Sequence, residues 1–195
     1  MVLASASPRR RRMLEDAGIP FEVVPADIDE KMRGGESPDE YARRTAGEKG
    51  QTVGARLREQ GKTPWIVAAD TVVVLDGRVL EKPRDEDEAL EMLDRLEGRT
   101  HTVITGWTVG RDGGPWIVEH AETRVTFHEL TVEQRRGYVA TGEGMDKAGA
   151  YAIQDLGAFL VDRIDGNYFN VVGLPISHVV RALLEVGALP MFPLP

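Results

Sequence analysis

The sequence contains no cysteine. This absence excludes thiolate catalysis, cysteine-ligated zinc, iron–sulfur clusters and disulfide bonds, because each of them needs a cysteine sulfur. It also fits a reducing compartment, in which disulfides are rare. The chain must therefore obtain its stability and its chemistry from other side chains.

Long hydrophobic runs are also missing. The longest stretch without a charged side chain, Gly166 to Val180, is too short and too rich in Gly, Asn and Pro to cross a bilayer as a helix. The small apolar residues 1–7 precede the basic run Arg9 to Arg12, which is the reverse of the order in a secretory signal. We therefore expect no membrane association and a cytoplasmic location.

Positive charge is in the minority. Lys and Arg number 24 against 32 Asp and Glu, which gives a formal net charge of −8. A chain of this charge lacks the positive field of a general nucleic-acid-binding protein, so we expect no nucleic acid partner. The signatures G-x-G-x-x-G and G-x-x-x-x-G-K-[ST] are absent, so neither a dinucleotide-binding turn nor a P-loop is indicated. Any phosphate site must be local.

What is present is the composition of a folded chain. The 195 residues, 42% of them hydrophobic, suffice for a core of ordinary size. There is no internal repeat, low-complexity tract or flexible linker, which predicts a single compact domain or two tightly joined lobes. Residues 2–17 read as a strand, a tight turn and a helix, and Asp76-Gly77 predicts a hairpin, so the sheet is expected to be mixed.

The local patterns predict where strands and helices lie. Strands are expected at residues 2–6, 21–25, 65–69, 71–75, 78–80, 102–109, 116–127, 151–153 and 158–161. Helices are expected at residues 8–17, from the cap at 37 to about 59, from the cap at 85 to 98, after the cap at 131, and at residues 175–186.

The turn from Ser5 to Arg10 lies at the predicted junction between the first strand and the first helix. It combines two hydroxyls, the free backbone N–H groups of a helix start and two guanidinium groups, which together favour a phosphate. A capped helix with a solvated arginine face accounts for the same residues, and both interpretations stay open.

Asp70 follows the apolar run 65–69, and we expect it at the end of a buried strand, where side chains project beyond the sheet edge. A buried carboxylate without a partner is costly, so a divalent metal or another cation must lie nearby. Lys82 is a candidate partner, and a simple Asp–Lys salt bridge is the alternative to a functional site. Lys49, Lys82 and Lys147 all fall in or beside polar loops and would suit a phosphate chain.

Two glycine-rich stretches, Gly142 to Gln154 and Gly166 to Pro175, place polar side chains between apolar segments. Gln154, Asn167 and Asn170 could hydrogen-bond a base or a sugar in a cleft wall. Tight loops at the glycines and helix caps at the asparagines are the alternative.

Six blocks of the chain together carry a family resemblance. They are Leu3-Ala-Ser-Ala-Ser-Pro-Arg-Arg10, Ala69-Asp-Thr-Val-Val73, Glu81-Lys-Pro83, Gly98-Arg-Thr-His-Thr-Val-Ile-Thr-Gly106, Asp146-Lys-Ala-Gly-Ala-Tyr-Ala-Ile-Gln154 and Asn170-Val-Val-Gly-Leu-Pro175. In order and spacing they closely resemble the Maf family of nucleoside triphosphate pyrophosphatases, over nearly the whole chain.

The resemblance implies a single Maf-like domain over residues 1–195. Its fold would be α/β, with a central mixed, twisted sheet flanked by helices and two lobes with a cleft between them, as in Maf and ITPase-like proteins. It also implies an enzyme that hydrolyses a nucleoside triphosphate to the monophosphate and pyrophosphate with a divalent Mg or Mn cation, often as a homodimer.

The resemblance assigns catalytic roles by position. Asp70 matches the catalytic acidic residue of the family, and Asp70 with Glu30 would hold the metal. Lys49 and Lys82 match pocket positions and would neutralise charge on the leaving pyrophosphate.

Substrate-binding positions follow in the same way. Ser7 and Arg10 match pocket positions, whereas Arg9, Thr71 and Gln154 match positions linked to nucleotide preference. The combination of Arg9, Thr71 and Gln154 resembles that of the dTTP/UTP subgroup and disfavours the 7-methyl-GTP subgroup. It implies a role in clearing dTTP, UTP or modified pyrimidine nucleotides from the cellular pool.

Two points stay open at this stage. The chain could bind nucleotides without hydrolysing them, as a regulatory protein linked to septum formation, although Asp70 and Lys82 argue against pure binding. Gly50 replaces the alanine usual after the pocket lysine, a change expected to loosen the helix by about 1 kcal/mol.

Overall fold

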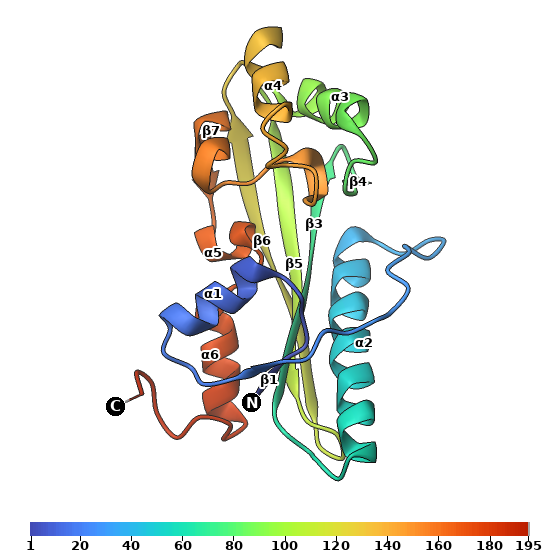
Figure 1. The fold of residues 1–195 in the computed structure, drawn as a ribbon, viewed down its shortest axis with the longest axis vertical. Helices are drawn as coiled ribbons and strands as arrows, with labels where there is room; N and C mark the ends of the chain where they lie inside the picture. The colour runs from blue at the N-terminus through green and yellow to red at the C-terminus, as the bar shows by residue number, and fades with distance from the viewer. Residues whose placement is uncertain (195) are drawn as a thin grey trace. The chain divides into compact units, whose positions relative to one another are not determined.

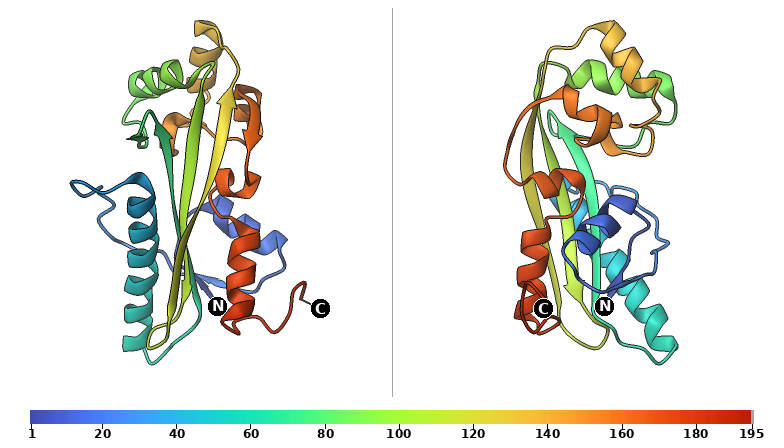
Figure 2. Two further views of the ribbon diagram at one scale, coloured as in Figure 1. Left: turned by 180° about the vertical axis from the view of Figure 1, so that it is seen from behind. Right: turned by 60° about the vertical axis from the view of Figure 1, so that its left-hand side comes forward.

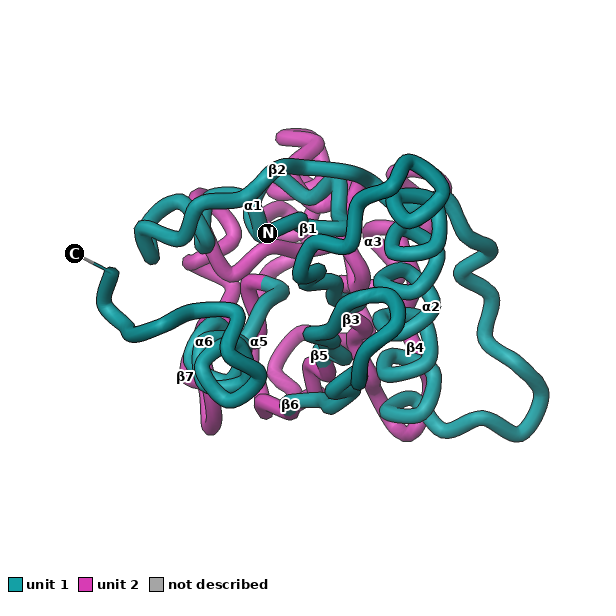
Figure 3. The backbone as a smooth tube through the Cα atoms, turned by 90° about the horizontal axis from the view of Figure 1, so that it is seen from below, with its two compact units in different colours: residues 1–70, 105–121, 173–195 teal, residues 71–104, 122–172 magenta. Residues whose placement is uncertain are grey.

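The computed structural model describes residues 1–194. By its internal contacts the chain forms two compact units. Unit 1 comprises residues 1–70, 105–121 and the described residues from 173 on, and unit 2 comprises residues 71–104 and 122–172 (Figure 3). Each unit is assembled from segments that are distant in sequence.

A mixed sheet of seven strands is present in the described residues. The strands are β1 (Val2–Leu3), β2 (Glu22–Val23), β3 (Ile66–Leu75), β4 (Arg78–Leu80), β5 (Thr100–Gly110), β6 (Trp116–Phe127) and β7 (Val161–Asp165). Their order is β2-β1-β3-β5-β6-β7, with β4 paired to β3. β1 is parallel to β2 and β3, whereas the β3–β4 and β6–β7 pairs are antiparallel, which confirms the predicted mixed sheet.

The β3–β4 connection shows why the hairpin was predictable. Asp76 and Gly77 adopt positive φ angles of 51° and 74°, the conformation that a two-residue hairpin turn with the right twist requires. Glycine adopts a positive φ without steric clash because it has no Cβ, and aspartate is one of the residues that tolerate this conformation.

Unit 1 contains three helices among its described residues: α1 (Pro8–Asp16), α2 (Pro38–Glu59) and α6 (Ile176–Glu185). In Figures 1 and 3, α2 lies along one face of the unit 1 strands, and α1 and α6 lie along the other. Ser7 caps α1 with Pro8 at its first position, and Ser37 and Glu40 form the predicted capping box of α2. Between α2 and the strands, apolar side chains including Val53, Leu57 and Ile66 form a buried cluster.

Unit 2 contains α3 (Glu86–Leu96), α4 (Val132–Val139) and α5 (Tyr168–Val172), together with the short 3-10 helices η1 (Ala148–Ala150) and η2 (Asp155–Leu160). Both views of Figure 2 show α3 and α4 side by side, and they pack on each other. The predicted stripe of α3, Ala89, Met92, Leu93 and Leu96, is buried in the core of this unit.

The predicted strands at 151–153 and 158–161 are wrong. The first segment is irregular and most of the second belongs to η2, so the strand β7 begins only at Val161. Ala150 and Asp155 adopt positive φ angles, which interrupt an extended strand at both ends of the segment between them. Side chains, not a neighbouring strand, satisfy several of its backbone N–H groups.

None of the helices in residues 1–194 combines the length and the apolar character that a membrane crossing requires.

Candidate active site

Asp70 lies inside strand β3, not at its end as the sequence predicted. The strand continues because residues 72–75 are apolar and mostly buried and residues 73–75 pair with β4, so the run 65–69 and the run 71–75 form one strand. Asp70 is buried, with 7% of the residue exposed. A charge this buried requires an opposite charge at short range.

Lys49 provides that charge. Its Nζ lies 2.8 Å from Asp70 Oδ1 and 2.8 Å from Glu30 Oε2, so one ammonium group joins two carboxylates. Lys49 is 7% exposed and lies in the middle of α2, not in or beside a loop as the sequence suggested. Helix α2 therefore carries the cation of the site, strand β3 carries one acid, and the β2–α2 loop carries the other.

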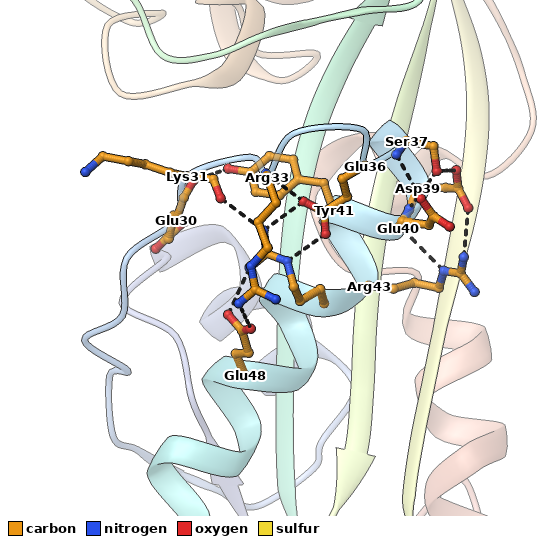
Figure 4. Close-up of polar contacts among 11 residues, drawn as sticks. Glu30, Lys31, Arg33, Glu36, Ser37, Asp39, Glu40, Tyr41, Arg43 and Glu48 are labelled. Atoms are coloured by element: carbon orange, nitrogen blue, oxygen red, sulfur yellow. Dashed lines mark hydrogen bonds and ion pairs between the residues drawn. The ribbon is translucent and has the colours of Figure 1, made fainter.

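The β2–α2 loop is attached to the first turns of α2. The Tyr41 hydroxyl donates a hydrogen bond to the carbonyl of Glu30, and Arg44 Nη2 donates one of 3.0 Å to the carbonyl of Lys31. In Figure 4 Tyr41 reaches the loop from α2, and Glu48 lies about two turns further along the same helix. These bonds hold the carbonyl of Glu30 and the next carbonyl of the backbone, and so they restrict where the Glu30 carboxylate can lie.

Arg44 is the centre of this attachment. Its guanidinium lies 2.6 Å from Glu36 Oε1 and 2.9 Å from Glu48 Oε2, and its side chain is only 15% exposed. The pKa of Glu36 is lowered to about 2, mainly by the hydrogen bond that Arg44 donates to its carboxylate. The pair therefore stays ionised across the physiological pH range and keeps the loop attached.

The turn before α1 lies in the same unit. Ser7 caps the helix by accepting a hydrogen bond of 3.4 Å from the Arg10 N–H, and the Ser5 hydroxyl accepts one of 3.2 Å from the Ser7 N–H. Arg10 is fixed as well, because its Nε donates to the carbonyl of Gly173 at 2.7 Å and its Nη1 to Ser5 Oγ at 3.2 Å. The predicted helix cap is confirmed, but Arg10 is held by these bonds and does not belong to a solvated arginine face, whereas Arg11 and Arg12 are exposed.

Electrostatics connect Arg10 to the two acids. Burial lowers the pKa of the Arg10 guanidinium, and the nearby Asp70 carboxylate opposes that shift. Arg9 lowers the pKa further, whereas Glu30 raises it. Two arginines, one lysine and two carboxylates thus lie within electrostatic range in unit 1. Such a mixture of charges can bind a metal-bearing polyanion.

Three further predicted site residues are Thr71, Lys82 and Gln154. Thr71 directly follows Asp70 in β3 and is half-buried. Lys82 is exposed after β4, and Gln154 is half-buried immediately before η2. Lys82 and Gln154 belong to unit 2, so their position relative to Asp70 stays a prediction.

The two asparagines of the second glycine-rich stretch have structural partners. Asn170 is fully buried and donates hydrogen bonds of 3.0 Å to the carbonyl of Val103 and to Thr123 Oγ1. Asn167 accepts a bond of 3.2 Å from the Asn170 N–H at the start of α5. Asn167 therefore caps α5, as the capping alternative expected, whereas Asn170 lies within α5 and caps no helix, because its side chain bonds to β5 and β6.

Sequence reasoning missed Tyr41 and Arg44. Both lie on the helix face that meets the β2–α2 loop, at a spacing of three residues, with Glu48 one turn further. The spacing of this tyrosine and this arginine could have predicted contacts with the acid-rich loop. That prediction also requires knowing that the loop folds back on α2.

Two acids of unit 1 could hold the implied Mg²⁺ or Mn²⁺. Asp70 and Glu30 supply two carboxylates that already share one cationic group. Within residues 1–194 no group of three or more His, Asp or Glu side chains is arranged to hold a metal. Two carboxylates nevertheless fit a magnesium ion that takes its other ligands from substrate phosphates and water.

Comparison with known proteins shows the family of this chain. The family model described as "Maf-like protein" matches residues 1–186. The "dTTP/UTP pyrophosphatase" of Syntrophomonas wolfei is 50% identical over 186 residues, covering 95% of this chain and 96% of that protein. The "dTTP/UTP pyrophosphatase" of Geobacter sulfurreducens is 47% identical over 190 residues, covering 97% of each chain.

Among solved structures, a HAM1 protein from Coxiella burnetii has a similar fold. Its TM-score is 0.51 at 14% identity, with 94% of this chain and 98% of that chain covered. At this identity the likeness concerns the fold alone. The family match over almost the entire chain and the two close relatives are decisive, and the chain belongs to the Maf-like protein family.

Proposed function

We propose that this protein hydrolyses dTTP and UTP to the nucleoside monophosphate and pyrophosphate. The observation that carries the proposal is the buried Lys49 bridging Asp70 and Glu30 near Arg10. The names of the relatives, at about half identity along the chain, supply the substrate class.

Positive groups of unit 1 are well suited to a triphosphate. Arg10 is held by Ser5 and Gly173, so its guanidinium has a fixed place beside the two acids. The N-terminus of α1 adds backbone N–H groups and the positive end of the helix dipole. In this proposal Arg9, Arg10, Lys49 and Lys82 neutralise the charge that develops on the leaving pyrophosphate.

Asp70 is proposed as the proton acceptor. A water oxygen attacks the α-phosphorus, a new P–O bond forms, and the bond from that phosphorus to the oxygen bridging to the β-phosphorus breaks. The attacking water loses its proton to the Asp70 carboxylate, and pyrophosphate leaves with the electron pair of the broken bond. A rigid strand position for Asp70 keeps its carboxylate oriented during this step.

Asp70 and Glu30 are also the residues proposed to hold a divalent cation. When bound, Mg²⁺ or Mn²⁺ would supply positive charge to the phosphate chain and lower the pKa of a coordinated water. Lys49 would then leave its place between the two carboxylates and contact a phosphate oxygen.

Base preference is assigned to Arg9, Thr71 and Gln154. Within residues 1–194 the Gln154 side chain has no hydrogen-bond partner, and it does not cap η2. Its carboxamide therefore has a donor and an acceptor available for a base edge.

Pyrophosphate release from dTTP, UTP, CTP, ATP, GTP and 7-methyl-GTP, with Mg²⁺ or Mn²⁺, tests the function. We expect release from dTTP and UTP, and a loss of at least about a hundredfold in kcat with Asp70→Asn, the usual contribution of a general base. Nucleotide-dependent thermal stabilisation without release from any nucleotide would instead favour the non-hydrolysing binding protein. Full activity of Asp70→Asn would refute the role of Asp70.

A cytoplasmic location and a homodimer belong to the same proposal. Light scattering of the purified protein measures the oligomeric state directly.

A further inference from the structure

Glu143 holds the segment of unit 2 that carries Gln154. We propose that Glu143 is a positioning residue that sets the preference for uracil and thymine over cytosine by fixing the backbone around Gln154. This inference rests on the proposed function, because it assigns how the same site distinguishes bases. Residues 152–157 are called the Gln154 loop below.

The Glu143 carboxylate binds one end of the Gln154 loop with both oxygens. Its Oε1 accepts a hydrogen bond of 3.0 Å from the Gly157 N–H, and its Oε2 accepts one of 3.2 Å from the Leu156 N–H. These two amides lie two and three residues after Gln154. A carboxylate is suited to this task because it is an acceptor at both oxygens.

Tyr138 extends the attachment to the other end of the loop. Its hydroxyl donates a hydrogen bond of 3.1 Å to Glu143 Oε1 and accepts one of 3.0 Å from the Ala152 N–H. Ala152 lies two residues before Gln154, so the backbone is held on both sides of it. The loop is also closed tightly, since a Cβ at Gly157 would overlap the Ala152 carbonyl and approach the Tyr138 hydroxyl to 2.8 Å.

The backbone of this region adopts conformations that need such support. Ala150 has a φ angle of 59°, in the left-handed region that residues with a Cβ rarely occupy, and Asp155, a residue type that tolerates this region better, has one of 51°. Strain of this kind persists only where surrounding contacts impose it. The hydrogen bonds to Glu143 and Tyr138 are contacts that can impose it at the loop.

The segment preceding the loop is held as well. His101 Nε2 lies 2.8 Å from the hydroxyl oxygen of Tyr151, and both residues are buried. The Gly149 N–H donates a bond of 3.1 Å to the carbonyl of Glu81, the residue before Lys82. Gln154 is therefore an unpaired amide on a backbone that is fixed from several directions.

Base chemistry explains why fixing the backbone affects preference. Uracil and thymine present the O4 acceptor beside the N3–H donor, whereas cytosine presents an amino donor beside the N3 acceptor. A carboxamide that could turn over freely would pair with either base by exchanging its donor and acceptor. Discrimination thus requires that Gln154 be held where only one orientation fits.

Glu143→Gln is the decisive variant. It replaces one carboxylate oxygen by an NH₂ donor, which must face a backbone N–H or the Tyr138 hydroxyl, while size is conserved. We expect the ratio of kcat/KM for UTP to that for CTP to fall by about tenfold or more, which is the discrimination of one good hydrogen bond. Amide hydrogen exchange at Ala152, Leu156 and Gly157 should accelerate in the same variant.

Two further variants separate positioning from general stability. Asp94→Asn removes a 2.6 Å ion pair with Arg135 elsewhere in unit 2 and should lower stability while leaving the UTP-to-CTP ratio unchanged. In a Gln154→Ala background, Glu143→Gln should cause no further change in the ratio, because the residue through which it acts is gone. An unchanged ratio in Glu143→Gln, or an equal change in the Gln154→Ala background, would overturn the inference while the hydrolytic function stands.

Failure of the proposed function is recognised separately. If the unmodified protein hydrolyses no nucleotide, the dissociation constants of α,β-methylene-UTP and α,β-methylene-CTP replace the kinetic ratio. A smaller difference between them in Glu143→Gln than in the unmodified protein retains the inference. Equal affinities in the unmodified protein would overturn it.

Discussion

Lys49 Nζ and Asp70 Oδ1 form a buried ion pair of 2.8 Å that joins the middle of helix α2 to the interior of strand β3. The second carboxylate on the same ammonium, Glu30, is about half exposed, with 48% of its side chain accessible. One lysine therefore balances two acids, and removing it leaves two neighbouring negative charges. This arrangement is what a divalent cation would also stabilise.

Lys49→Gln should destabilise the protein by about 3 kcal/mol, because breaking a buried pair leaves an uncompensated charge. Millimolar Mg²⁺ should then raise the melting temperature of Lys49→Gln more than that of the unmodified protein. The reason is that Asp70 and Glu30 would be free to bind the ion. Thermal unfolding during a Mg²⁺ titration, without nucleotide, measures the effect.

Lys62→Gln is the matched control, since Lys62 is exposed and the charge change is identical. Equal Mg²⁺ stabilisation of Lys49→Gln and Lys62→Gln would show that Asp70 and Glu30 do not form a cation site.

Arg44→Met should weaken the attachment of the β2–α2 loop to α2. The substitution removes the bonds of Arg44 to Glu36, to Glu48 and to the Lys31 carbonyl, so the Glu30 carboxylate loses its fixed position. We expect a loss of about 3 kcal/mol in the free energy of unfolding and a higher Mg²⁺ concentration at half-maximal activity.

Arg33→Met serves as the comparison for Arg44→Met. Arg33 pairs with Glu48 at 2.7 Å but is 65% exposed, so its loss should cost less than about 1 kcal/mol. The same Mg²⁺ requirement in both arginine variants would argue against a positioning role for Arg44.

Gly50→Ala should destabilise the protein, although alanine is the better helix former. A Cβ at position 50 would lie 2.8 Å from Trp116 Cζ3 and 2.9 Å from Thr108 Cγ2, so the side chains of the strands would have to move. Overpacking of this kind outweighs a gain of about 1 kcal/mol in helix propensity, and we expect a net loss of about 1 kcal/mol. Chemical denaturation gives the difference.

Gly137→Ala provides the opposite case, since Gly137 is also helical and a Cβ there meets no atom within 4 Å. It should gain stability by about 1 kcal/mol. The glycine at position 50 is thus explained by Trp116, and the expectation that it merely loosens the helix was incomplete.

His101→Gln should change how stability depends on pH. Burial lowers the pKa of His101 to about 4 from 6.5, so the unfolded chain takes up a proton in this window and the folded chain does not. Unfolding free energy therefore falls as pH drops from about 6.5 to about 4, by roughly 1 kcal/mol per unit in mid-window. Denaturation at several pH values should show a shallower fall for His101→Gln.

The exposed His178 supplies the control for this measurement. His178→Gln should retain the pH dependence of the unmodified protein, and an unchanged slope in His101→Gln would contradict the effect ascribed to burial.

Local signals in the sequence predicted most helices and strands correctly. Ser7-Pro8, Ser37 with Glu40, Asp85, and Thr131 with Gln134 all cap helices as expected. These predictions succeed because a cap or a hairpin turn is decided within a few residues, by hydrogen bonds and backbone conformations that the same residues provide.

Predictions failed where distant residues decide the backbone. Nothing near Tyr151 or Asp155 in sequence shows that Glu143 and Tyr138 satisfy the amides of this segment, so its apolar pattern suggested strands. Asp70 interrupts an apolar run, yet β3 continues through it because Lys49, from another element, neutralises the charge.

Motif spacing along the chain is enough to predict the family and, through it, the α/β class, and local patterns predict a mixed sheet and the types of residue available for phosphate chemistry. The pairing of Asp70 with Lys49, the sharing of this lysine with Glu30, and the bonds of Arg44 and Tyr41 to the β2–α2 loop become apparent only in the folded chain. Such pairs form between side chains far apart in the chain, and packing of α2 on the sheet selects which charges meet.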